Sequence, residues 1–438
     1  PHYSAIHQFI VMKNWTFLLF GALLFSACGP IEPNVADVTR VISVLASDEM
    51  RGRQAFAPEA MDAANFIASE FESIGLTKLD GDSDFIQDFS LYTVSTASVA
   101  ATINGEKLAP DFVAASVSAE TLNWMEGGDV TPTYVGAGDN LMTTWRSNRG
   151  APNALLIVHP DQKEAFDQIS GFLRRPSRTM KLEGGANMVM VLSAAKSVSS
   201  FSVEATASIS DMKIANVAGM IPGKRSDEIV VFSGHYDHLG VRNGAEPDSI
   251  YNGANDDASG TTAVIELARY FKSMGKPERS IYFVAFTAEE SGGYGSRHFS
   301  ETVNPDQIVA MFNIEMIGKP AVAGPNTAWI TGFDRSDFGA ILQEAVTGTV
   351  FSFYADPYPD QNLFYRSDNA TLARLGVPAH SISTTPIDVD TDYHQASDEV
   401  STLDLDHMTN AIKAIAAGAA TIISGEKTPT RIDPATVN

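Results

Sequence analysis

The stretch that decides the fold is IVVFSGHYDHLG at residues 229–240, followed by YNGANDDASG at residues 251–260. Its first four apolar residues predict a short buried strand. The second part is a loop rich in Gly, Asn and Asp. After that loop, apolar residues recur at the spacing of an amphipathic helix, at Ala263, Val264, Leu267, Ala268 and Phe271. A histidine and several acids therefore lie where a strand ends and a helix begins, and open α/β sheets place their functional sites at that edge.

The rest of the chain repeats this alternation of strand and helix patterns. Strand patterns lie at 280–287, 308–317 and 378–382, and helical patterns lie at 338–346 and 403–423. Strands that alternate with helices predict an α/β fold with a mostly parallel central sheet, flanked by helices on both faces. A helical pattern also spans 34–79, with a break at Arg51-Gly52-Arg53 and a stop at Gly75.

Composition excludes one class of function and limits the chemistry. Asp and Glu number 53 against 30 Lys and Arg, which gives a net charge of -23. Nucleic-acid binding needs a basic face, so a nucleic-acid partner is not expected. The single cysteine, Cys28, leaves the domain that follows it without an internal disulfide. No obligate protein partner is evident.

Cys28 lies at the end of a segment typical of export. An apolar run at 15–25 follows Lys13 and is short for a membrane span, as in a signal peptide. Ser26-Ala27-Cys28 resembles the cleavage site of a bacterial lipoprotein, although a plain signal peptide with a chance cysteine stays open. We therefore expect an exported protein, in the bacterial periplasm, attached to the outer membrane or at the cell surface. Its only membrane contact would be a lipid at Cys28.

Titratable residues gather in or after the predicted strands. They are His235 and Asp237, Asp256 and Asp257, Glu289 and Glu290, Glu315, and Tyr393 with His394. Taken singly, a Glu pair is usually surface and an Asp pair in a Gly/Asn loop is usually a turn. Glu315, however, lies within an apolar run, and a buried carboxylate needs a partner or a metal. Histidines and carboxylates without cysteine suit Zn²⁺, so the joint pattern favours a metal site.

Five short motifs carry a resemblance to a known family. They are HYD at 235–237, GANDDASG at 253–260, EESG at 289–292, NIEMIG at 313–318 and DYH at 392–394. In this order and spacing they resemble the co-catalytic di-zinc exopeptidase family. That family includes bacterial leucyl aminopeptidases and aminopeptidase Y, and it is related to glutamate carboxypeptidase and glutaminyl cyclase. The resemblance extends over residues 214–424.

The resemblance implies two Zn²⁺ ions per chain, with Asp256 bridging them. His235 and Glu315 would complete one site, and Glu290 and His394 the other. The family more often has aspartate at the position of Glu315. A glutamate keeps the carboxylate but is one methylene longer, so we expect metal binding to persist with altered geometry.

The resemblance also implies three roles close to the metals. Asp237 would orient the ring of His235, Glu289 would be the general base, and Tyr393 would help to stabilise the oxyanion. It further suggests a cis peptide after Asp256. Two further histidines, His238 and His298, are expected on loops or the surface.

These motifs divide the chain into parts and favour one activity. Residues 1–27 are upstream residues and a lipoprotein-type signal peptide, 34–84 and 212–425 form a discontinuous zinc peptidase domain, and 426–438 are a tail. Residues 85–211 are an inserted smaller β-rich domain. This insertion resembles a protease-associated domain loosely, and an unrelated β-rich insertion is equally open. We expect it to cover one rim of the cleft.

The expected activity is that of an aminopeptidase acting on peptides. A carboxypeptidase or dipeptidase of the same superfamily stays open, with Arg335, Arg366 or Arg374 holding a substrate carboxylate. A glutaminyl cyclase fits less well, because both halves of a five-ligand metal set are present. A non-catalytic binding relative would lack ligands or the base, and none is missing.

Overall fold

The computed structural model describes residues 29–242, 244 and 248–437. The expected signal peptide and the lipidation site at Cys28 lie outside these residues, so both stay predictions. Within the described part of the chain, no helix has the length and apolar character that crossing a membrane requires.

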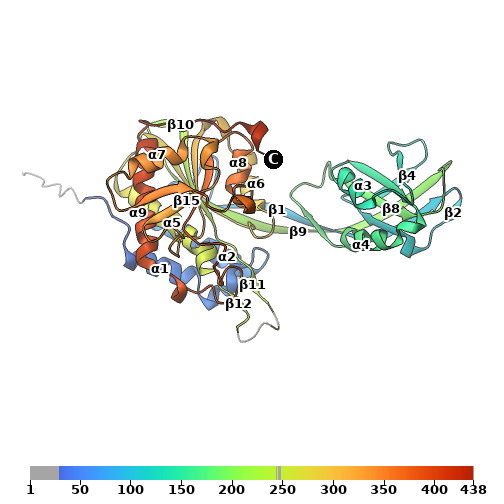
Figure 1. The fold of residues 1–438 in the computed structure, drawn as a ribbon, viewed down its shortest axis with the longest axis horizontal. Coiled ribbons are helices and arrows are strands. Elements are labelled where there is room, and N and C mark those ends of the chain that lie inside the picture. The colour runs from blue at the N-terminus through green and yellow to red at the C-terminus, as the bar shows by residue number, and fades with distance from the viewer. Residues whose placement is uncertain (1–28, 243, 245–247, 438) are drawn as a thin grey trace, which may run out of the picture.

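The main body of the molecule is built on a sheet whose central strands run parallel (Figure 1). Strand β10 (Arg225–His235) pairs in parallel with β13 (Arg279–Phe286) and β14 (Ile308–Ile314), and β14 pairs in parallel with β17 (Ala379–Ser383). On either side of these four strands, the next strand pairs in the antiparallel direction. The flanking strands are β9 (Phe201–Ile221) beyond β13, and β15 (Thr327–Ile330) with β16 (Ser352–Ala355) beyond β17. The α/β fold predicted from the sequence is confirmed.

Helices cover both faces of this sheet, because successive side chains of a strand point to opposite faces. Val230 and Phe232 of β10 pack in one apolar core, and Ile229 and Val231 pack in another. The first core lies under α1 (Val35–Leu45), α2 (Pro58–Ile74), α5 (Ser259–Ser273), α7 (Phe338–Ala345) and α9 (Leu405–Ile423). The second lies under α6 (Tyr294–Thr302) and α8 (Asn369–Ala373). Gly75 caps α2 with φ 82°, as its sequence position predicted.

Two long antiparallel strands carry the chain out to the insertion. β1 (Ile86–Ile103) pairs with β9 from Ile86 opposite Val217 to Ile103 opposite Phe201. At the far end lies a second sheet with its own apolar core. Its strands are β3 (Val113–Ser116), β8 (Asn187–Leu192), β6 (Asn153–Val158) and β5 (Pro132–Val135), accompanied by α3 (Leu141–Asn148) and α4 (Lys163–Leu173). Short strands complete the set, at β2 (Glu106–Lys107), β4 (Thr121–Met125), β7 (Ser177–Thr179), β11 (Gly240–Val241) and β12 (Ile250–Tyr251).

The insertion extends away from the main body instead of covering a rim of the cleft (Figure 1). The reason is the length of the β1–β9 ribbon, which holds the second sheet at a distance. The segment around β7 returns toward the main body. There Tyr294 Oη donates to the carbonyl oxygen of Arg178 at 3.2 Å.

One buried arginine ties the N-terminal segment to the loops at the end of β10. Arg53 is fully buried at the end of a 3₁₀ turn, Asp48–Arg53. Its guanidinium donates to the carbonyl oxygens of Tyr236 at 2.6 Å, Leu45 at 2.5 Å, Asn252 at 2.6 Å and Gly253 at 3.0 Å. The planar fork of an arginine suits such divergent acceptors, whereas an ammonium group does not.

Replacing Arg53 by lysine should therefore destabilise the protein strongly. Arg53→Lys keeps the charge but leaves buried carbonyls without donors, so we expect a loss of about 2–4 kcal/mol in the free energy of unfolding. Chemical denaturation followed by tryptophan fluorescence measures it. The matched control is Arg51→Lys on the same turn. The ion pair of Arg51 with Glu59 is partly exposed and should contribute under about 1 kcal/mol. Equal losses in the two variants would contradict this role.

A buried histidine links the sheet to α7. His380 in β17 donates from Nδ1 to the carbonyl oxygen of Thr331 at 2.8 Å, and its Nε2 accepts from Ser336 Oγ at 2.7 Å. A neutral ring that is protonated at Nδ1 makes both bonds. Burial lowers the pKa of His380 to about 4.

His380 should make stability fall on acidification. Its folded pKa lies below an unfolded value of about 6.5, so the unfolded state binds more protons between these pH values and stability is lost as pH falls. Between pH 7.5 and 5 the loss due to this group is about 2 kcal/mol. His380→Gln should lack that pH-dependent component. The difference in the free energy of unfolding between the wild type and His380→Gln should therefore shrink by this amount between pH 7.5 and 5. A difference that does not change with pH would contradict the assignment.

Candidate metal centre

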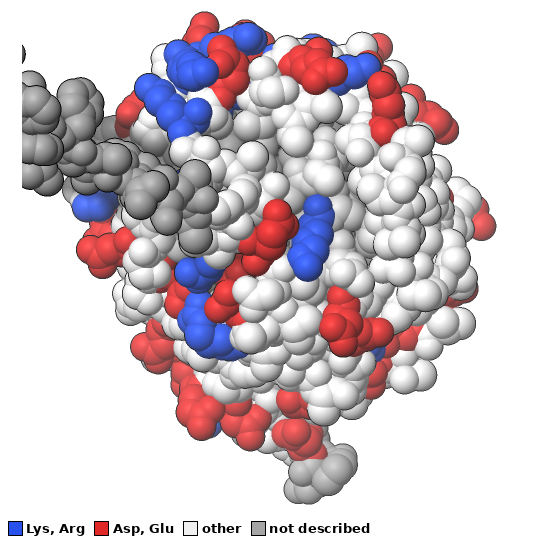
Figure 2. Space-filling view, turned by 90° about the vertical axis from the view of Figure 1, so that its left-hand side faces the viewer, with Lys and Arg blue, Asp and Glu red and all other residues white. Residues whose placement is uncertain are grey.

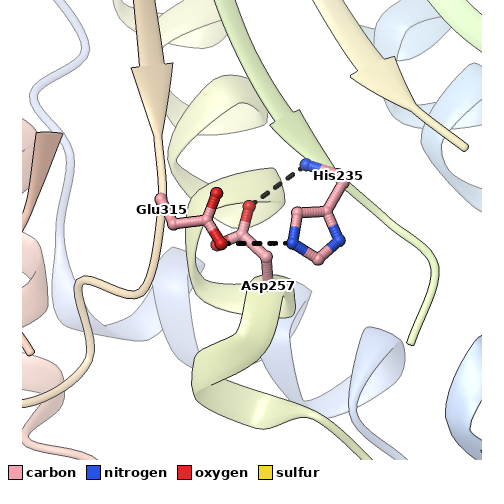
Figure 3. Close-up of side chains that lie close together, drawn as sticks. All are labelled: His235, Asp257 and Glu315. Carbon is pink, nitrogen blue, oxygen red and sulfur yellow. Dashed lines mark hydrogen bonds and ion pairs between the residues drawn. The ribbon is translucent and has the colours of Figure 1, made fainter. Parts of the chain in front are cut away.

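The first cluster of the predicted site forms where β10 and β14 end. His235 is the last residue of β10 and is 1% exposed. Its Nε2 lies 3.3 Å from Oε1 of Glu315, the residue after β14. Figure 3 shows these two side chains pointing toward one another, with Asp257 beside them. Parallel neighbouring strands end at the same edge of the sheet, which explains the meeting of residues 80 positions apart.

Asp256 lies between this cluster and a second one. Its Oδ1 is 3.3 Å from Nε2 of His235, and its Oδ2 is 3.2 Å from Nε2 of His394. The same His394 nitrogen lies 3.3 Å from Oε2 of Glu290. The two oxygens of one carboxylate thus face two histidines, each of which has a glutamate beside it. The structure brings together all five residues that were predicted as metal ligands.

His238 lies on the loop after β10, as expected, but it is buried and belongs to the second cluster. It is 1% exposed, and its Nδ1 lies 2.9 Å from Oε1 of Glu290 and 3.9 Å from Oδ2 of Asp256. Neither ring nitrogen makes a hydrogen bond. Gly253 makes room for the ring, since a Cβ there would lie 2.4 Å from Cγ of His238. The one signal in the sequence was the position of His238 directly after Asp237. His298, by contrast, stacks on Phe89 with ring centroids 4.3 Å apart and takes no part in the clusters.

Asp257 lies near the first cluster, but its oxygens are used by backbone amides. Oδ1 accepts from Met316 N at 3.0 Å and from Gly260 N at 2.9 Å, and Oδ2 accepts from His235 N at 3.1 Å. The carboxylate therefore joins the ends of β10 and β14 to the start of α5. The Asp256–Asp257 peptide is cis, as the motif suggested.

Asp237 supports the site in two ways. Its carbonyl oxygen lies 3.0 Å from Nδ1 of His235, whereas its carboxylate Oδ1 lies at 3.7 Å. The backbone oxygen, and not the expected carboxylate, is thus the nearer group that orients the ring. The carboxylate instead accepts from Glu289 N at 3.1 Å. Burial raises the pKa of Asp237 to about 7.

Three further residues that lie outside the five motifs hold the site. Asp398 accepts from Asn255 N at 2.9 Å and from Asp256 N at 3.0 Å. Lys319 pairs with Asp390 at 2.5 Å and with Asp392 at 2.7 Å, which fixes the loop that carries Tyr393 and His394. Ser367 Oγ donates to Oε2 of Glu315. Each of the three acts on a segment that is distant in the sequence.

Comparisons with known proteins agree with this arrangement. Residues 216–419 match Peptidase family M28. The chain carries an M28 peptidase domain. This confirms the family predicted from the five sequence motifs.

The M28 domain has relatives among curated proteins and solved structures. Leucine aminopeptidase 1 of Trichophyton rubrum is 29% identical over 215 residues, which cover 46% of this chain and 56% of that protein. The chain thus matches about half the length of that relative. The aminopeptidase from Aneurinibacillus sp. strain AM-1 has a TM-score of 0.51 at 18% identity, over 93% of this chain and 96% of its own. The zinc aminopeptidase of Bacillus subtilis has a TM-score of 0.54 at 17% identity, over 91% and 98%. These two structures show the shared fold.

The surroundings of Glu289 and Tyr393 shift the pKa of both side chains. Burial raises the pKa of Glu289 well above its usual value, and the neighbouring Glu315 and Asp368 add to the rise, while His235 opposes it. Tyr393 stacks on His394 with ring centroids 4.0 Å apart. Burial also raises the pKa of Tyr393, so its phenol stays protonated at neutral pH and is able to donate a hydrogen bond.

The donor set fits a metal ion. Six carboxylates and three histidines meet here, namely Asp237, Asp256, Asp257, Glu289, Glu290, Glu315, His235, His238 and His394. So many acids at a buried site require compensating positive charge. Oε1 of Glu290, Oδ2 of Asp237 and both nitrogens of His238 are buried without a hydrogen-bond partner. Nitrogen and oxygen donors of this kind suit Zn²⁺.

His238 should contribute to metal affinity. His238→Gln removes a buried ring nitrogen beside Glu290 and should weaken metal binding at one site about 10–100-fold, the range found for residues that support a metal site. Competition with a zinc-sensitive dye measures the affinity. His159→Gln in the insertion is the matched control, since that ring is partly exposed and bonds only locally. Unaltered binding in His238→Gln would exclude the role.

Proposed function

We propose that this chain is a zinc-dependent aminopeptidase that releases N-terminal residues from peptides, with two Zn²⁺ ions per chain. The observation that carries this proposal is the position of Asp256. Its oxygens lie 3.3 Å from His235 and 3.2 Å from His394. A carboxylate shared in this way is typical of two-metal hydrolytic sites, whose ions lie about 3.5–4 Å apart. The M28 family and the names of its relatives support the choice of reaction.

Some residues of the site would bind the metal ions, and others would take part in the reaction. Asp256 would hold both ions, His235 and Glu315 the first, and Glu290 and His394 the second. When bound, zinc lowers the pKa of water toward about 7 and polarises a scissile carbonyl.

Glu289 is placed to act on the proton of the attacking water. Its amide is fixed by the carboxylate of Asp237, and the preceding Ala288 has φ 57°, which turns the chain after β13. The neighbours Glu289 and Glu290 can therefore serve different roles. The carboxylate of Glu289 would take up the proton and then return it to the departing amine.

Tyr393 completes the proposed mechanism. Its phenol stays protonated beside His394, and it would donate a hydrogen bond to the oxygen on which negative charge develops. The chain would then supply an acid–base group, an oxyanion donor and the ligands for two ions.

A carboxypeptidase or dipeptidase stays the second candidate, and one observation bears on it. Of the three arginines considered for a substrate carboxylate, Arg335 is engaged by the carbonyl oxygen of Thr436 at 2.9 Å and by Tyr365 Oη at 2.8 Å. Arg366 lines a pocket that Glu315 and Tyr393 also line. A substrate carboxylate near the metals would meet Arg366.

Glu289→Gln should separate chemistry from metal binding. We expect kcat on an aminoacyl p-nitroanilide to fall about 10²–10⁴-fold, because the amide cannot accept the proton. Zinc content should stay unchanged, since Glu290 and Asp256 are untouched. The measurements are steady-state kinetics and metal analysis of the same preparation.

The control for this experiment is Glu344→Gln, which removes an exposed carboxylate paired with Lys427. Activity should be lost on chelation and return with added Zn²⁺. Full activity in Glu289→Gln would exclude the mechanism. Cleavage of N-blocked peptides with no action on free N-termini would favour the carboxypeptidase instead.

A further inference from the structure

A pocket opens next to the first metal cluster. Apolar side chains form much of its wall, at Met316, Trp329, Leu363 and Ile387, and Glu315 and Tyr393 line its inner side. Its mixed apolar and polar lining suits one substrate side chain or the end of a short peptide. A side chain entering it would come from a residue whose peptide bond lies at the metals.

Arg366 is the one cation that lines this pocket among the described residues. It follows a 3₁₀ turn at Leu363–Tyr365, and its Nη2 donates to Tyr393 Oη at 3.4 Å. No carboxylate pairs with it in the described part of the chain. Lys319, by contrast, is held by Asp390 and Asp392. Arg366 is also exposed, so its guanidinium is able to bind an anion.

The polar groups deeper in the pocket are already bonded within the protein. Ser381 Oγ donates to Asn369 Oδ1 at 2.9 Å, and Ser383 Oγ donates to the carbonyl oxygen of Met316 at 2.9 Å. Glu315 receives the hydroxyl of Ser367 and faces His235. The group left to recognise a substrate by charge is therefore Arg366.

We propose that Arg366 binds a carboxylate of the substrate in this pocket. The proposal rests on the proposed peptidase function and names its substrate class. A guanidinium pairs with a carboxylate through two parallel hydrogen bonds, which a lysine does not reproduce. The carboxylate has two possible sources, an acidic side chain on the N-terminal residue or the free C-terminus of a dipeptide.

Two matched substrate pairs test the proposal on the zinc-loaded protein. The first pair is Glu-p-nitroanilide and Gln-p-nitroanilide, and the second is Leu-Leu and Leu-Leu-amide. In each pair only the charge of one group differs. Arg366→Gln should lower the ratio of kcat/KM, charged over neutral, about tenfold in at least one pair, mainly through KM. For Arg366→Lys this ratio should lie between those of the wild type and Arg366→Gln, because lysine keeps the positive charge but lacks the two parallel donors of the guanidinium.

Each outcome has a distinct meaning. A change in the first pair identifies an acidic side chain, and a change in the second identifies a C-terminal carboxylate. Unchanged ratios in both pairs would overturn the proposal, as would an equal loss on all four substrates, which would mean that Arg366 acts through Tyr393. If the wild-type protein cleaves none of the four, the proposed function itself fails and this inference with it.

The control variant is Arg149→Gln. It removes one exposed positive charge from the insertion, where Arg149 stacks over Trp145. It should leave both ratios at the wild-type value. Since Arg366 is exposed, Arg366→Gln should fold normally, and circular dichroism checks this.

Discussion

The shared carboxylate of Asp256 is the constraint on which the site depends. For its two oxygens to face His235 and His394, the backbone around it has to be held on both sides. Asp398 accepts the amide of Asp256, and Arg53 binds the carbonyl of Gly253. The next residue, Asp257, accepts amides from the ends of two strands and from the start of α5. Each partner is buried, so the position of the carboxylate is set by the core and not by the loop alone.

The same site gathers more negative charge than a buried region tolerates by itself. Burial raises the pKa of Asp237 to about 7 and that of Asp398 to about 6, which shows how unfavourable further ionisation is there. Arg53 is affected in the opposite sense. Burial lowers its pKa to about 10, while Asp398 and Asp237 counteract the fall. The acids thus keep a buried arginine charged, and the arginine holds the loops that present the acids. A bound cation would add to this mutual stabilisation.

The sequence predicted those parts of the protein whose information is local. Helices α1 and α2 and the parallel sheet follow from periodicity, and the grouping of five candidate ligands follows from the resemblance of five short motifs to a known family. The burial of His238 does not follow from any local pattern, because it depends on the absence of a side chain at Gly253. Asp398 meets Asn255 over 143 residues, and Arg53 meets Tyr236 over 183. Contacts of this range leave no pattern in a single sequence. The long β1–β9 pairing was also not predicted, since the sequence indicated only that the insertion is β-rich.

The placement of the insertion changes how it can affect the site. Its sheet lies away from the main body, so it does not cover the cleft directly (Figure 1). The ribbon that carries it does contact the site. Phe89 and Leu91 of β1 and Ile214 of β9 pack in one apolar cluster with Ala288, the residue before Glu289. Since Ala288 turns the chain and Asp237 holds the next amide, the ribbon forms one wall behind the proposed base. Packing at Ala288 therefore gives one route by which the insertion could influence catalysis.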